Sequence, residues 1–272
     1  MTPEVEKYDQ RGASASKKEV HHAIRNLDKG LYPNAFCKIL PDVAGGDADF
    51  CNIMHADGAG TKTSLAYLYW KETGDISVWR GIAQDALVMN LDDMACCGCL
   101  DDILISNTIA RNKHLIPGEV IEEIIEGTIA FVEAMGERGI SIKHAGGETA
   151  DTGDIVRTID VGITAFGRMP RKELIVNQIK PGAVIIGLAS DGKANYEAEY
   201  NSGIGSNGLT SARHDMLHHM YAAKYPESFS PETDIRYVYN GPWQLTDKVN
   251  VGNEEINVGK LLLSPTRTFL PI

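Results

Sequence analysis

A glycine-rich segment after a short apolar run constrains this chain more than any other part of its sequence. Residues 50–54, Phe-Cys-Asn-Ile-Met, suit a strand, and residues 55–63 continue as His-Ala-Asp-Gly-Ala-Gly-Thr-Lys-Thr. Because Gly58 and Gly60 carry no Cβ, the backbone there can come close to a ligand. Exposed N–H groups in such a turn form a concave anion site. The segment therefore predicts a turn between a strand and a helix that can hold an anion.

Side chains of this turn fit a metal-bound polyphosphate. Lys62 supplies a point charge suited to phosphate, and Thr61 adds a hydroxyl group. Asp57 offers a hard oxygen for Mg²⁺, which proteins usually hold through one or two carboxylates plus substrate phosphates. The alternative is a plain strand-to-helix turn with a surface lysine.

Two familiar phosphate loops do not fit this turn. In a Walker A motif the lysine directly follows a glycine, whereas here Thr61 stands between Gly60 and Lys62. In a dinucleotide fingerprint the third glycine would stand at Thr63. The turn therefore belongs to another class of phosphate site, or to none.

The composition is that of an ordinary globular protein without nucleic-acid or membrane partners. The chain has 272 residues, enough for two domains, of which 43% are hydrophobic and 23% charged. Acidic residues number 37 against 26 Lys and Arg, a net charge of −11, so the basic footprint of a nucleic-acid binder is missing. The sequence shows neither an apolar run of the ~20 residues that span a bilayer nor a signal-peptide core. We expect a cytoplasmic protein.

Five cysteines in a chain without a secretion signal do not suggest a disulfide framework. Cys96, Cys97 and Cys99 cluster near the end of a predicted helix. A zinc site would need a second ligand pair at suitable spacing, and His114 is isolated in the sequence. We expect these cysteines to be small buried residues.

Helix-like and strand-like segments alternate along the chain, which predicts a layered α/β architecture. The clearest is the helix over residues 118–138, with one apolar stripe and a solvated face of glutamates. The first 16 residues are polar and expected to be mobile. The other predicted helices are residues 17–28, 64–71, 78–97 and 208–225, and the predicted strands are residues 50–56, 102–109, 141–145, 156–168 and 183–190.

A domain boundary is predicted near residue 170. The segments Pro170-Arg171-Lys172 and Lys180-Pro181-Gly182 bracket a connecting stretch. Residues 183–190 would then be the first strand of a second domain, and residues 191–206 a long polar stretch within it.

The predicted helix over residues 78–97 carries three acids in an apolar surface. Asp85 and Asp92 are seven residues apart and share a face, and Asp93 follows directly. Buried carboxylates are costly unless they are paired or bind a metal. The alternative is a fringe of solvated acids.

A second glycine motif repeats the logic of the first. Gly146-Gly147-Glu148-Thr149 follows a predicted strand and offers an acid and a hydroxyl. Glu148 is a plausible second metal ligand. The alternative is a capped turn.

Two weaker motifs lie further along the chain. Residues 203–208 match Gly-x-Gly-x-x-Gly literally, but no apolar strand precedes them, so we expect a loop leading into a helix whose N-terminus could face an anion. His214 and His218 are four residues apart, a spacing that can bind zinc. Without the intervening glutamate of a metalloprotease, we favour surface histidines.

Taken together, these stretches resemble the phosphoribosylformylglycinamidine cyclo-ligases (aminoimidazole ribonucleotide synthetases), and the resemblance covers nearly the whole chain. The acid–glycine loop alone marks a wider superfamily, which includes formylglycinamidine ribonucleotide amidotransferases, selenophosphate synthetase, thiamine monophosphate kinase and a hydrogenase-maturation dehydratase. The Gly-Gly-Glu-Thr-Ala and Pro-Thr-Arg motifs favour the cyclo-ligase, and a first cysteine as late as Cys37 speaks against selenophosphate synthetase. The matching stretches are residues 8–12 (Tyr-Asp-Gln-Arg-Gly), 57–62 (Asp-Gly-Ala-Gly-Thr-Lys), 91–94 (Leu-Asp-Asp-Met), 146–150 (Gly-Gly-Glu-Thr-Ala), 206–208 (Ser-Asn-Gly) and 263–267 (Leu-Ser-Pro-Thr-Arg).

The resemblance implies an α/β (α+β layered) fold in two parts. Residues 1–169 would form an N-terminal ATP-binding and dimerisation domain, a sheet-and-helix domain that pairs its sheet in a homodimer. Residues 170–272 would form an incomplete second α/β domain, because family members continue past the Pro-Thr-Arg motif with further strands and a His-x-Thr-Gly-Gly-Gly loop, whereas this chain stops at Ile272.

The resemblance also implies a reaction in purine biosynthesis. ATP phosphorylates the formamide oxygen of formylglycinamidine ribonucleotide, and the amidine nitrogen displaces phosphate to close the ring of aminoimidazole ribonucleotide. Such a step needs positioning and charge neutralisation more than a protein nucleophile. Other ATP-using members of the superfamily, or a nucleotide-binding fragment without turnover, remain as alternatives.

The resemblance assigns roles to particular residues. Asp57, Lys62 and Asp93 would be catalytic. Asp92 stands where the family has asparagine, and residues 191–206 are an insert. The metal ligands, for Mg²⁺, would be Asp57, Asp92, Asp93 and Glu148, and the ATP-binding residues Gly58, Gly60, Thr61, Lys62, Gly146, Gly147, Glu148, Thr149 and Asn207.

Overall fold

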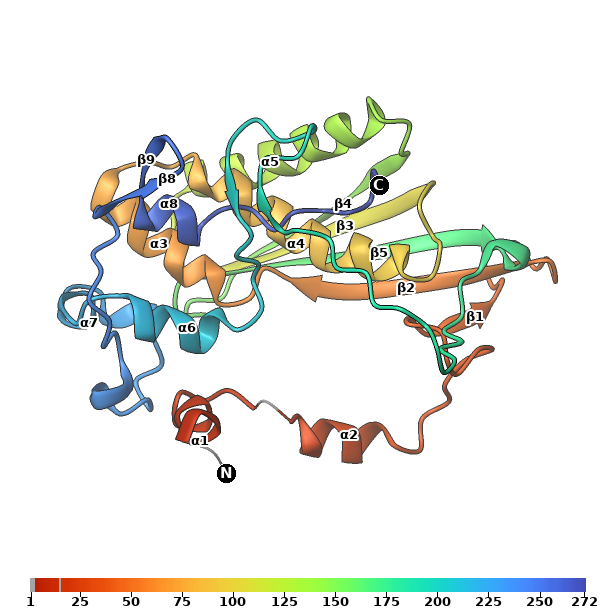
Figure 1. Cartoon of the computed structure of the whole chain (residues 1–272), viewed down its shortest axis with the longest axis horizontal. Coiled ribbons are helices and arrows are strands. Elements are labelled where there is room, and N and C mark those ends of the chain that lie inside the picture. The colour runs from red at the N-terminus through yellow and green to blue at the C-terminus, as the bar shows by residue number, and fades with distance from the viewer. Residues whose placement is uncertain (1–2, 15) are drawn as a thin grey trace.

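The computed structural model describes residues 3–14 and 16–272, and a five-stranded sheet organises it (Figure 1). The strand order is β1-β2-β5-β3-β4. β3 and β4 are parallel, and the other neighbouring pairs are antiparallel. The strands are β1 (Ile39–Pro41), β2 (Phe50–Gly58), β3 (Ile103–Arg111), β4 (Ile142–Asp151) and β5 (Ile159–Pro170).

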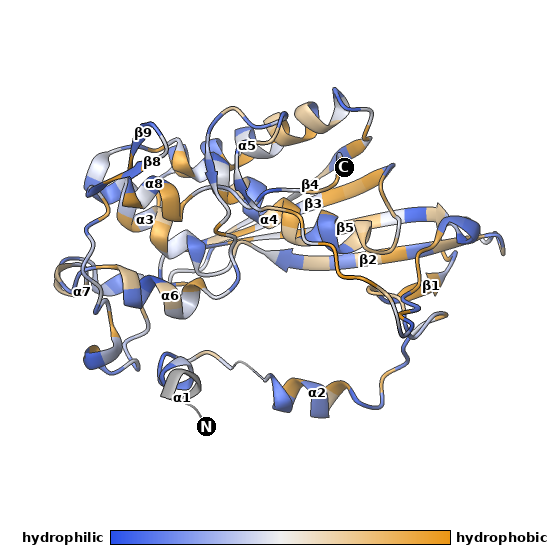
Figure 2. Cartoon of the chain, in the orientation of Figure 1, coloured by the Kyte–Doolittle hydropathy of each residue, from blue (hydrophilic) through white to orange (hydrophobic). Residues whose placement is uncertain are grey.

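Three helices cover one face of this sheet (Figure 1). They are α3 (Lys62–Thr73), α4 (Val78–Ala95) and α5 (Gly118–Gly136). Figure 2 colours the ribbon of these elements by hydropathy. Buried apolar residues of these helices and strands form the core. β5 shows the cause, because its side chains alternate between buried and half-buried positions, as a strand with one covered face requires. The predicted α/β layered fold is confirmed.

The opposite face of the sheet is open to solvent. Cross-strand partners share a face, so the register places Met54, Leu104 and Phe166 together there. Met54 is 63% exposed and Leu104 is 41% exposed. An apolar sheet face of this kind suits contact with another surface.

Only part of the remaining chain, as far as the structure describes it, packs against α3. Helices α6 and α8 contact α3, and the N-terminal helices lie to one side of the body (Figure 1). These remaining elements are α1 (Pro3–Gln10), α2 (Lys18–Ile24), α6 (Leu209–Met216), α7 (Met220–Lys224), α8 (Val258–Leu262), β6 (Asp191–Gly192), β7 (Asn201–Ser202), β8 (Lys248–Val251) and β9 (Glu254–Asn257), with short 3-10 turns at Arg171–Glu173, Pro226–Ser228 and Ile235–Tyr237.

Two predicted elements of the second part are wrong. Residues 183–190 form no strand, and Ile185 is fully exposed. Among the described residues no strand lies beside them to satisfy their backbone groups and cover their apolar side chains, which a strand requires. The helix over residues 208–225 breaks at Leu217, whose extended backbone separates α6 from α7. The boundary near residue 170 coincides with the end of β5 and stays a prediction.

The described part of the first 16 residues contains a helix and one anchored side chain, and the expected mobility stays a prediction. Helix α1 is followed by Arg11, whose side chain is fully buried. Its guanidinium donates to Asp215 through both terminal nitrogens, each at 2.9 Å, and to the carbonyl oxygens of Ser211 and Tyr237, each at 3.0 Å. This planar group therefore fastens the N-terminal segment to α6.

Among the described residues, none of the helices combines the length and the apolar character that a membrane span requires.

We predict that Gly127→Ala destabilises the contact between α4 and α5. A Cβ at Gly127 would lie 2.7 Å from Arg80 Cα and 2.9 Å from its carbonyl oxygen, so the two helices would have to separate. Overpacking of this kind costs about 1–3 kcal/mol. The matched control is Gly136→Ala in the same helix, where a Cβ meets no atom within 4 Å. Urea unfolding should show a loss only for Gly127→Ala, and equal midpoints for the two variants would contradict the prediction.

Candidate nucleotide and metal site

The turn between β2 and α3 has one glycine for packing and one for an open surface. A Cβ at Gly58 would lie 2.6 Å from the carbonyl oxygen of Val161, so this position serves the close approach of β2 to β5. Gly60 has a positive φ of 59°, which favours glycine, and a Cβ there would meet open space. Only Gly60 therefore leaves the backbone free to approach a ligand.

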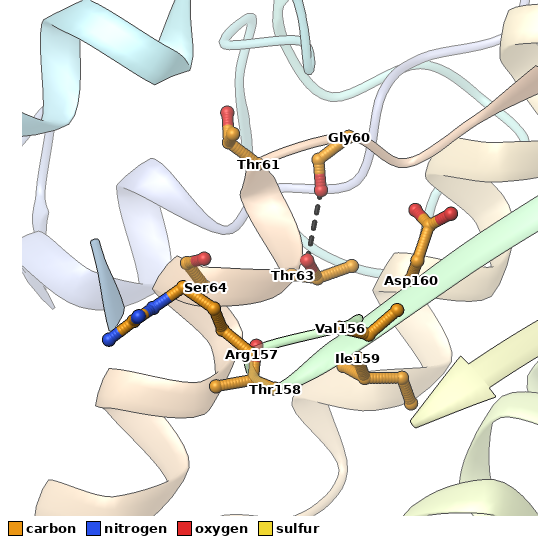
Figure 3. Close-up of a pocket in the computed structure, with 9 residues that line it drawn as sticks. All are labelled: Gly60, Thr61, Thr63, Ser64, Val156, Arg157, Thr158, Ile159 and Asp160. Carbon is orange, nitrogen blue, oxygen red and sulfur yellow. Dashed lines mark hydrogen bonds between the residues drawn. The ribbon is translucent and has the colours of Figure 1, made fainter. Parts of the chain in front are cut away.

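An open depression of about 310 Å³ lies beside this turn (Figure 3). The start of α3 carries no side-chain cap. The N–H groups of Thr63 and Ser64 donate to the carbonyl oxygens of Gly60 at 3.3 Å and Thr61 at 3.1 Å, so the N–H groups of Thr61 and Lys62 are the ones left for an anion. Thr63 donates to the carbonyl oxygen of Gly60 at 2.9 Å and holds the turn closed (Figure 3). The lining residues are Gly60, Thr61, Thr63, Ser64, Val156, Arg157, Thr158, Ile159 and Asp160.

Arg157 brings a cation to this depression, and sequence reasoning missed it. Its guanidinium donates to the carbonyl oxygens of Pro226 at 2.7 Å and Glu227 at 3.1 Å. Carbonyl partners do not neutralise its charge, so Arg157 can still attract a phosphate. Its place in a strand-like alternation gave no signal for this role.

A hydrogen-bonded network connects Asp57 and Asp93 on the helix-covered side of the turn. His55 Nε2 lies 3.1 Å from Asp93 Oδ2, and His55 Nδ1 lies 3.0 Å from Asn90 Oδ1. Asn90 in turn donates to the backbone oxygen of Asp57 at 3.2 Å. The Asp57 side chain is exposed and accepts from the N–H of Gly58 at 2.7 Å. This hydrogen-bonded chain ties the end of β2 to α4.

The charge of this cluster favours a cation. Partial burial raises the pKa of Asp93 above its ordinary value of 3.8, the negative charge of Asp57 adds to the rise, and His55 opposes it. Two like charges near each other are relieved by a bound cation. Asp57 is linked to Asp93 through Asn90 and His55, and their roles as metal ligands stay a prediction.

Asp92 faces away from this cluster and holds the C-terminal segment. Its two oxygens accept from the hydroxyl of Thr268 at 2.6 Å and the N–H of Phe269 at 2.9 Å. Burial raises the pKa of Asp92 above 3.8. Its carboxylate is therefore committed to a structural contact rather than to the metal site that the sequence suggested.

Lys62 is also committed, and its predicted position at the phosphate surface is wrong. The side chain is fully buried, and Nζ donates to Asp85 Oδ1 at 2.8 Å and to the carbonyl oxygen of Ser264 at 2.6 Å. The same Asp85 oxygen accepts from the N–H of Thr266 at 2.8 Å and from its hydroxyl at 2.6 Å. Asp85 therefore follows the paired alternative for a buried carboxylate.

Glu148 lies on the opposite face of the sheet from Asp57. Asp57 pairs with Ile163, and Ile163 pairs with Asn107, on the buried side. Glu148 pairs with Thr108, whose side chain is exposed on the other side. Three strand spacings of about 4.8 Å also separate the two strands. The structure therefore separates Glu148 from Asp57 and Asp93 within one chain.

The Gly-Gly-Glu-Thr motif lies inside β4 rather than in a turn after it. The register of β3 and β4 shifts between Ile105 and Asn107, opposite this motif, where Gly146 has a φ of 98°. A Cβ at Gly147 would lie 2.3 Å from the carbonyl oxygen of Asn107. These glycines thus permit a β-bulge. Thr149 pairs with Ile109 further along the strand.

Asn207 is exposed in the turn before α6, where Gly208 has a φ of 82°. The neighbouring helix reaches the glycine turn, because the Thr210 and Thr61 hydroxyl oxygens lie 2.9 Å apart. The Ser-Asn-Gly motif is therefore close in space to the first glycine motif.

Among residues 7–14 and 16–272, no group of three or more His, Cys, Asp or Glu side chains is arranged to hold a metal.

The predicted surface position of the paired histidines is wrong for His214. His214 is 2% exposed, and its Nδ1 accepts from the N–H of Tyr239 at 3.3 Å. Burial lowers the pKa of His214 to about 3, and the charges of Arg213 and Arg11 add to the effect. His218 is exposed, as expected.

Comparisons with known proteins agree with this geometry. A sequence model described as AIR synthase related protein, N-terminal domain, matches residues 42–169. Over these residues the chain is similar to the AIR synthase related family. The matched range covers the glycine turn, the two carboxylates and most of the sheet.

The curated relatives similar to this chain share one name. Phosphoribosylformylglycinamidine cyclo-ligase of Saccharolobus solfataricus is 28% identical over 69% of this chain and 54% of its own length. The Pyrococcus horikoshii enzyme of that name is 28% identical over 82% of this chain and 51% of its own. The Pyrococcus furiosus enzyme is 33% identical over 61% and 43%. The chain spans about half the length of the curated relatives it matches.

Solved structures are more distant. A protein of Thermus thermophilus matches with a TM-score of 0.38 at 15% identity, over 61% of this chain and 47% of that one. T. maritima PurL complexed with ATP matches with a TM-score of 0.29 at 14% identity, over 62% and 27%. Scores this low say nothing about the chemistry of the AIR synthase related domain.

We predict that Asp85→Asn strongly destabilises the fold. The variant leaves the Lys62 ammonium buried without a counter-charge, and breaking such a pair costs about 3–5 kcal/mol. The matched control is Glu126→Gln, which removes an ion pair to Arg80 on the surface and should cost at most about 1 kcal/mol. Chemical denaturation measures both, and a loss below about 1 kcal/mol for Asp85→Asn would show that the pair is dispensable.

A second prediction concerns acid stability. The pKa of His214 is about 3 in the folded chain, against an ordinary value of 6.5. Between these values the unfolded chain binds a proton that the folded chain does not, so the free energy of unfolding falls as the pH falls through this window. His214→Gln should flatten this slope, whereas His218→Gln should keep it. Denaturant unfolding at a series of pH values measures the slope, and identical slopes for His214→Gln and the parent chain would refute the assignment.

Proposed function

We propose that this chain binds Mg-ATP and takes part in the ATP-dependent ring closure of formylglycinamidine ribonucleotide to aminoimidazole ribonucleotide. This is the activity of a ligase of purine biosynthesis. The observation that carries the proposal is the network that links Asp57, Asn90, His55 and Asp93 beside the glycine turn and the uncapped start of α3. The relatives named cyclo-ligase supply the reaction.

The donor set of the turn fits magnesium and phosphate. Mg²⁺ is usually held by one or two carboxylates together with substrate phosphates, and Asp57 and Asp93 are two such groups. The hydroxyl of Thr61 and the N–H groups of Thr61 and Lys62 would donate to phosphate oxygens, and Arg157 would add positive charge. Bound Mg²⁺ would neutralise phosphate charge. The side chain of Lys62, which is buried, would hold the turn in position and would not contact the nucleotide.

The open face of the sheet supports a homodimer. Met54 and Leu104 are exposed there beside the half-buried Phe166, and pairing with a second copy would bury them. In such a dimer Glu148 and Asn207 could serve a site that two chains share. We also propose residues 1–169 as the nucleotide-binding and dimerising part, with residues 170–272 as part of a second domain.

Binding of Mg-ATP tests the site directly. By calorimetry we expect Asp57→Asn and Asp93→Asn each to weaken Mg-ATP binding by about tenfold or more, because losing a direct charged ligand should cost at least as much as losing an outer partner of a metal site. Glu133→Gln, on the exposed face of α5, is the matched control. Unchanged affinity for Mg-ATP in both aspartate variants would contradict the proposed metal site.

Glu148→Gln separates a one-chain site from a shared one. Glu148 lies on the open face of its own chain, so the variant should leave Mg-ATP affinity unchanged in a monomer. A loss of affinity that appears only at concentrations where the chain dimerises would place Glu148 in the partner's site. Analytical ultracentrifugation of the same samples fixes the oligomeric state.

Turnover tests the reaction itself. The assay supplies formylglycinamidine ribonucleotide, ATP and Mg²⁺ and follows aminoimidazole ribonucleotide and ADP, with this chain and with the same chain extended by any coding sequence beyond Ile272. Product from the longer protein would support the cyclo-ligase. ATP use without that product would favour another member of the superfamily, and Mg-ATP binding without ADP release would favour a non-catalytic fragment.

A further inference from the structure

The five cysteines gather around the end of α4, although they come from three parts of the chain. Cys96, Cys97 and Cys99 follow the helix, Cys37 precedes β1, and Cys51 lies in β2. All are free thiols, and only Cys96 is exposed. The expected burial is therefore confirmed for Cys97 and Cys99 and wrong for Cys96. The proposed nucleotide site uses none of them.

Cys37 and Cys97 are in direct contact. The backbone N–H of Cys37 donates to Cys97 Sγ at 3.1 Å, and the Cys37 thiol donates to the carbonyl oxygen of Asp93 at 3.3 Å. The Cys97 sulfur is therefore hydrogen-bonded to the backbone nitrogen of Cys37, the residue whose side chain carries the second sulfur. To form a bond between the two sulfurs, the Cys37 thiol would leave the Asp93 oxygen by rotation about χ1. A disulfide bond then needs a closure to about 2.05 Å.

The surroundings of Cys97 favour a thiolate there and nowhere else in the cluster. The neighbouring Cys37 thiol and the backbone N–H groups of Cys37 and Phe36 lower the pKa of Cys97 below its ordinary value of 9.0. Burial raises the pKa of Cys51 and of Cys99. Because the thiolate is the reactive form, Cys97 is the nucleophile of the cluster.

We propose that Cys37 and Cys97 form a reversible disulfide bond when hydrogen peroxide oxidises the chain. The Cys97 thiolate attacks one peroxide oxygen, which leaves a sulfenic acid on Cys97 and releases hydroxide. The Cys37 sulfur then attacks Cys97 Sγ, and the Cys37 proton leaves with the sulfenic hydroxyl as water. In sum, two thiols and one hydrogen peroxide give one disulfide and two waters, and a dithiol reductant reverses the oxidation.

The disulfide would change the end of α4. It would link the segment before β1 covalently to the residues that follow the helix, and it would remove the S–H donor from the Asp93 carbonyl oxygen. The last turn of α4 would exchange one hydrogen bond for a covalent tether. Hydrogen exchange of amides in residues 93–97 should differ between the oxidised and reduced chain.

Peptide mapping of the intact chain tests the proposal. The chain is treated with hydrogen peroxide, denatured, alkylated with N-ethylmaleimide and digested. We expect the Cys37 peptide to be joined to the peptide that carries Cys96, Cys97 and Cys99, with fragmentation placing N-ethylmaleimide on Cys96 and Cys99 and not on Cys97. Dithiothreitol should separate the two peptides. Alkylation of both residues after oxidation, or a bond between another pair, would overturn the proposal without any variant.

Two kinds of variant sharpen this result. Cys97→Ser and Cys37→Ser should each lose the cross-linked peptide. The matched control is Cys96→Ser, which removes the exposed neighbouring thiol and should keep the cross-link. If Cys96→Ser abolishes the bond, the exposed thiol is the true partner and the assignment to Cys97 is wrong. Circular dichroism of each reduced variant confirms that the comparison concerns folded chains.

Discussion

The fold depends on a buried ion pair between Lys62 and Asp85. Lys62 is the first residue of α3, Asp85 lies in the middle of α4, and both contact the C-terminal segment at Ser264 and Thr266. An unpaired charge at this depth costs several kcal/mol, so the three elements have to arrive together. Since Thr61 directly precedes Lys62, the pair also fixes where the glycine turn stands.

The acidic residues of α4 look alike in the sequence but have different partners in the structure. Asp85 and Asp92 face the C-terminal segment, whereas Asp93, one residue further, faces the end of β2. A helix turns by about 100° at each residue, so adjacent acids point to different partners. The candidate site is therefore small, consisting of Asp57, Asp93 and the turn itself, and it sits on a rigid support.

The sequence predicted the layers and the principal turn because both follow from local patterns. The period-2 burial of β5 and the apolar stripe on α5 appear directly in the order of the residues. The residues on either side of Gly60 are enough to predict a turn there. Lys62, Asp92 and Arg11 bind partners that lie 176 to 226 residues away in the chain. The one exception among these partners is Asp85, which pairs with Lys62. Local patterns carry no record of such contacts, which explains why two of these residues were assigned to ligands.

The strand predicted over residues 183–190 failed for a related reason. A strand is stabilised by its neighbour, and an apolar run alone does not specify one. The reverse holds for β4, where the Gly-Gly-Glu-Thr motif has the composition of a turn but pairs with β3 through a bulge. In both cases the presence or absence of a partner strand decided the outcome.

The anchorage of Arg11 has a consequence for the segment that follows it. Arg11 is fastened to α6, and Leu31 donates its N–H to the carbonyl oxygen of Ile39 at 2.8 Å, so both ends of the intervening stretch are held. Helix α2 between them buries none of its residues. A protease that cut within α2 would therefore leave two pieces that stay associated, and the break would be visible on a denaturing gel but not by size under native conditions.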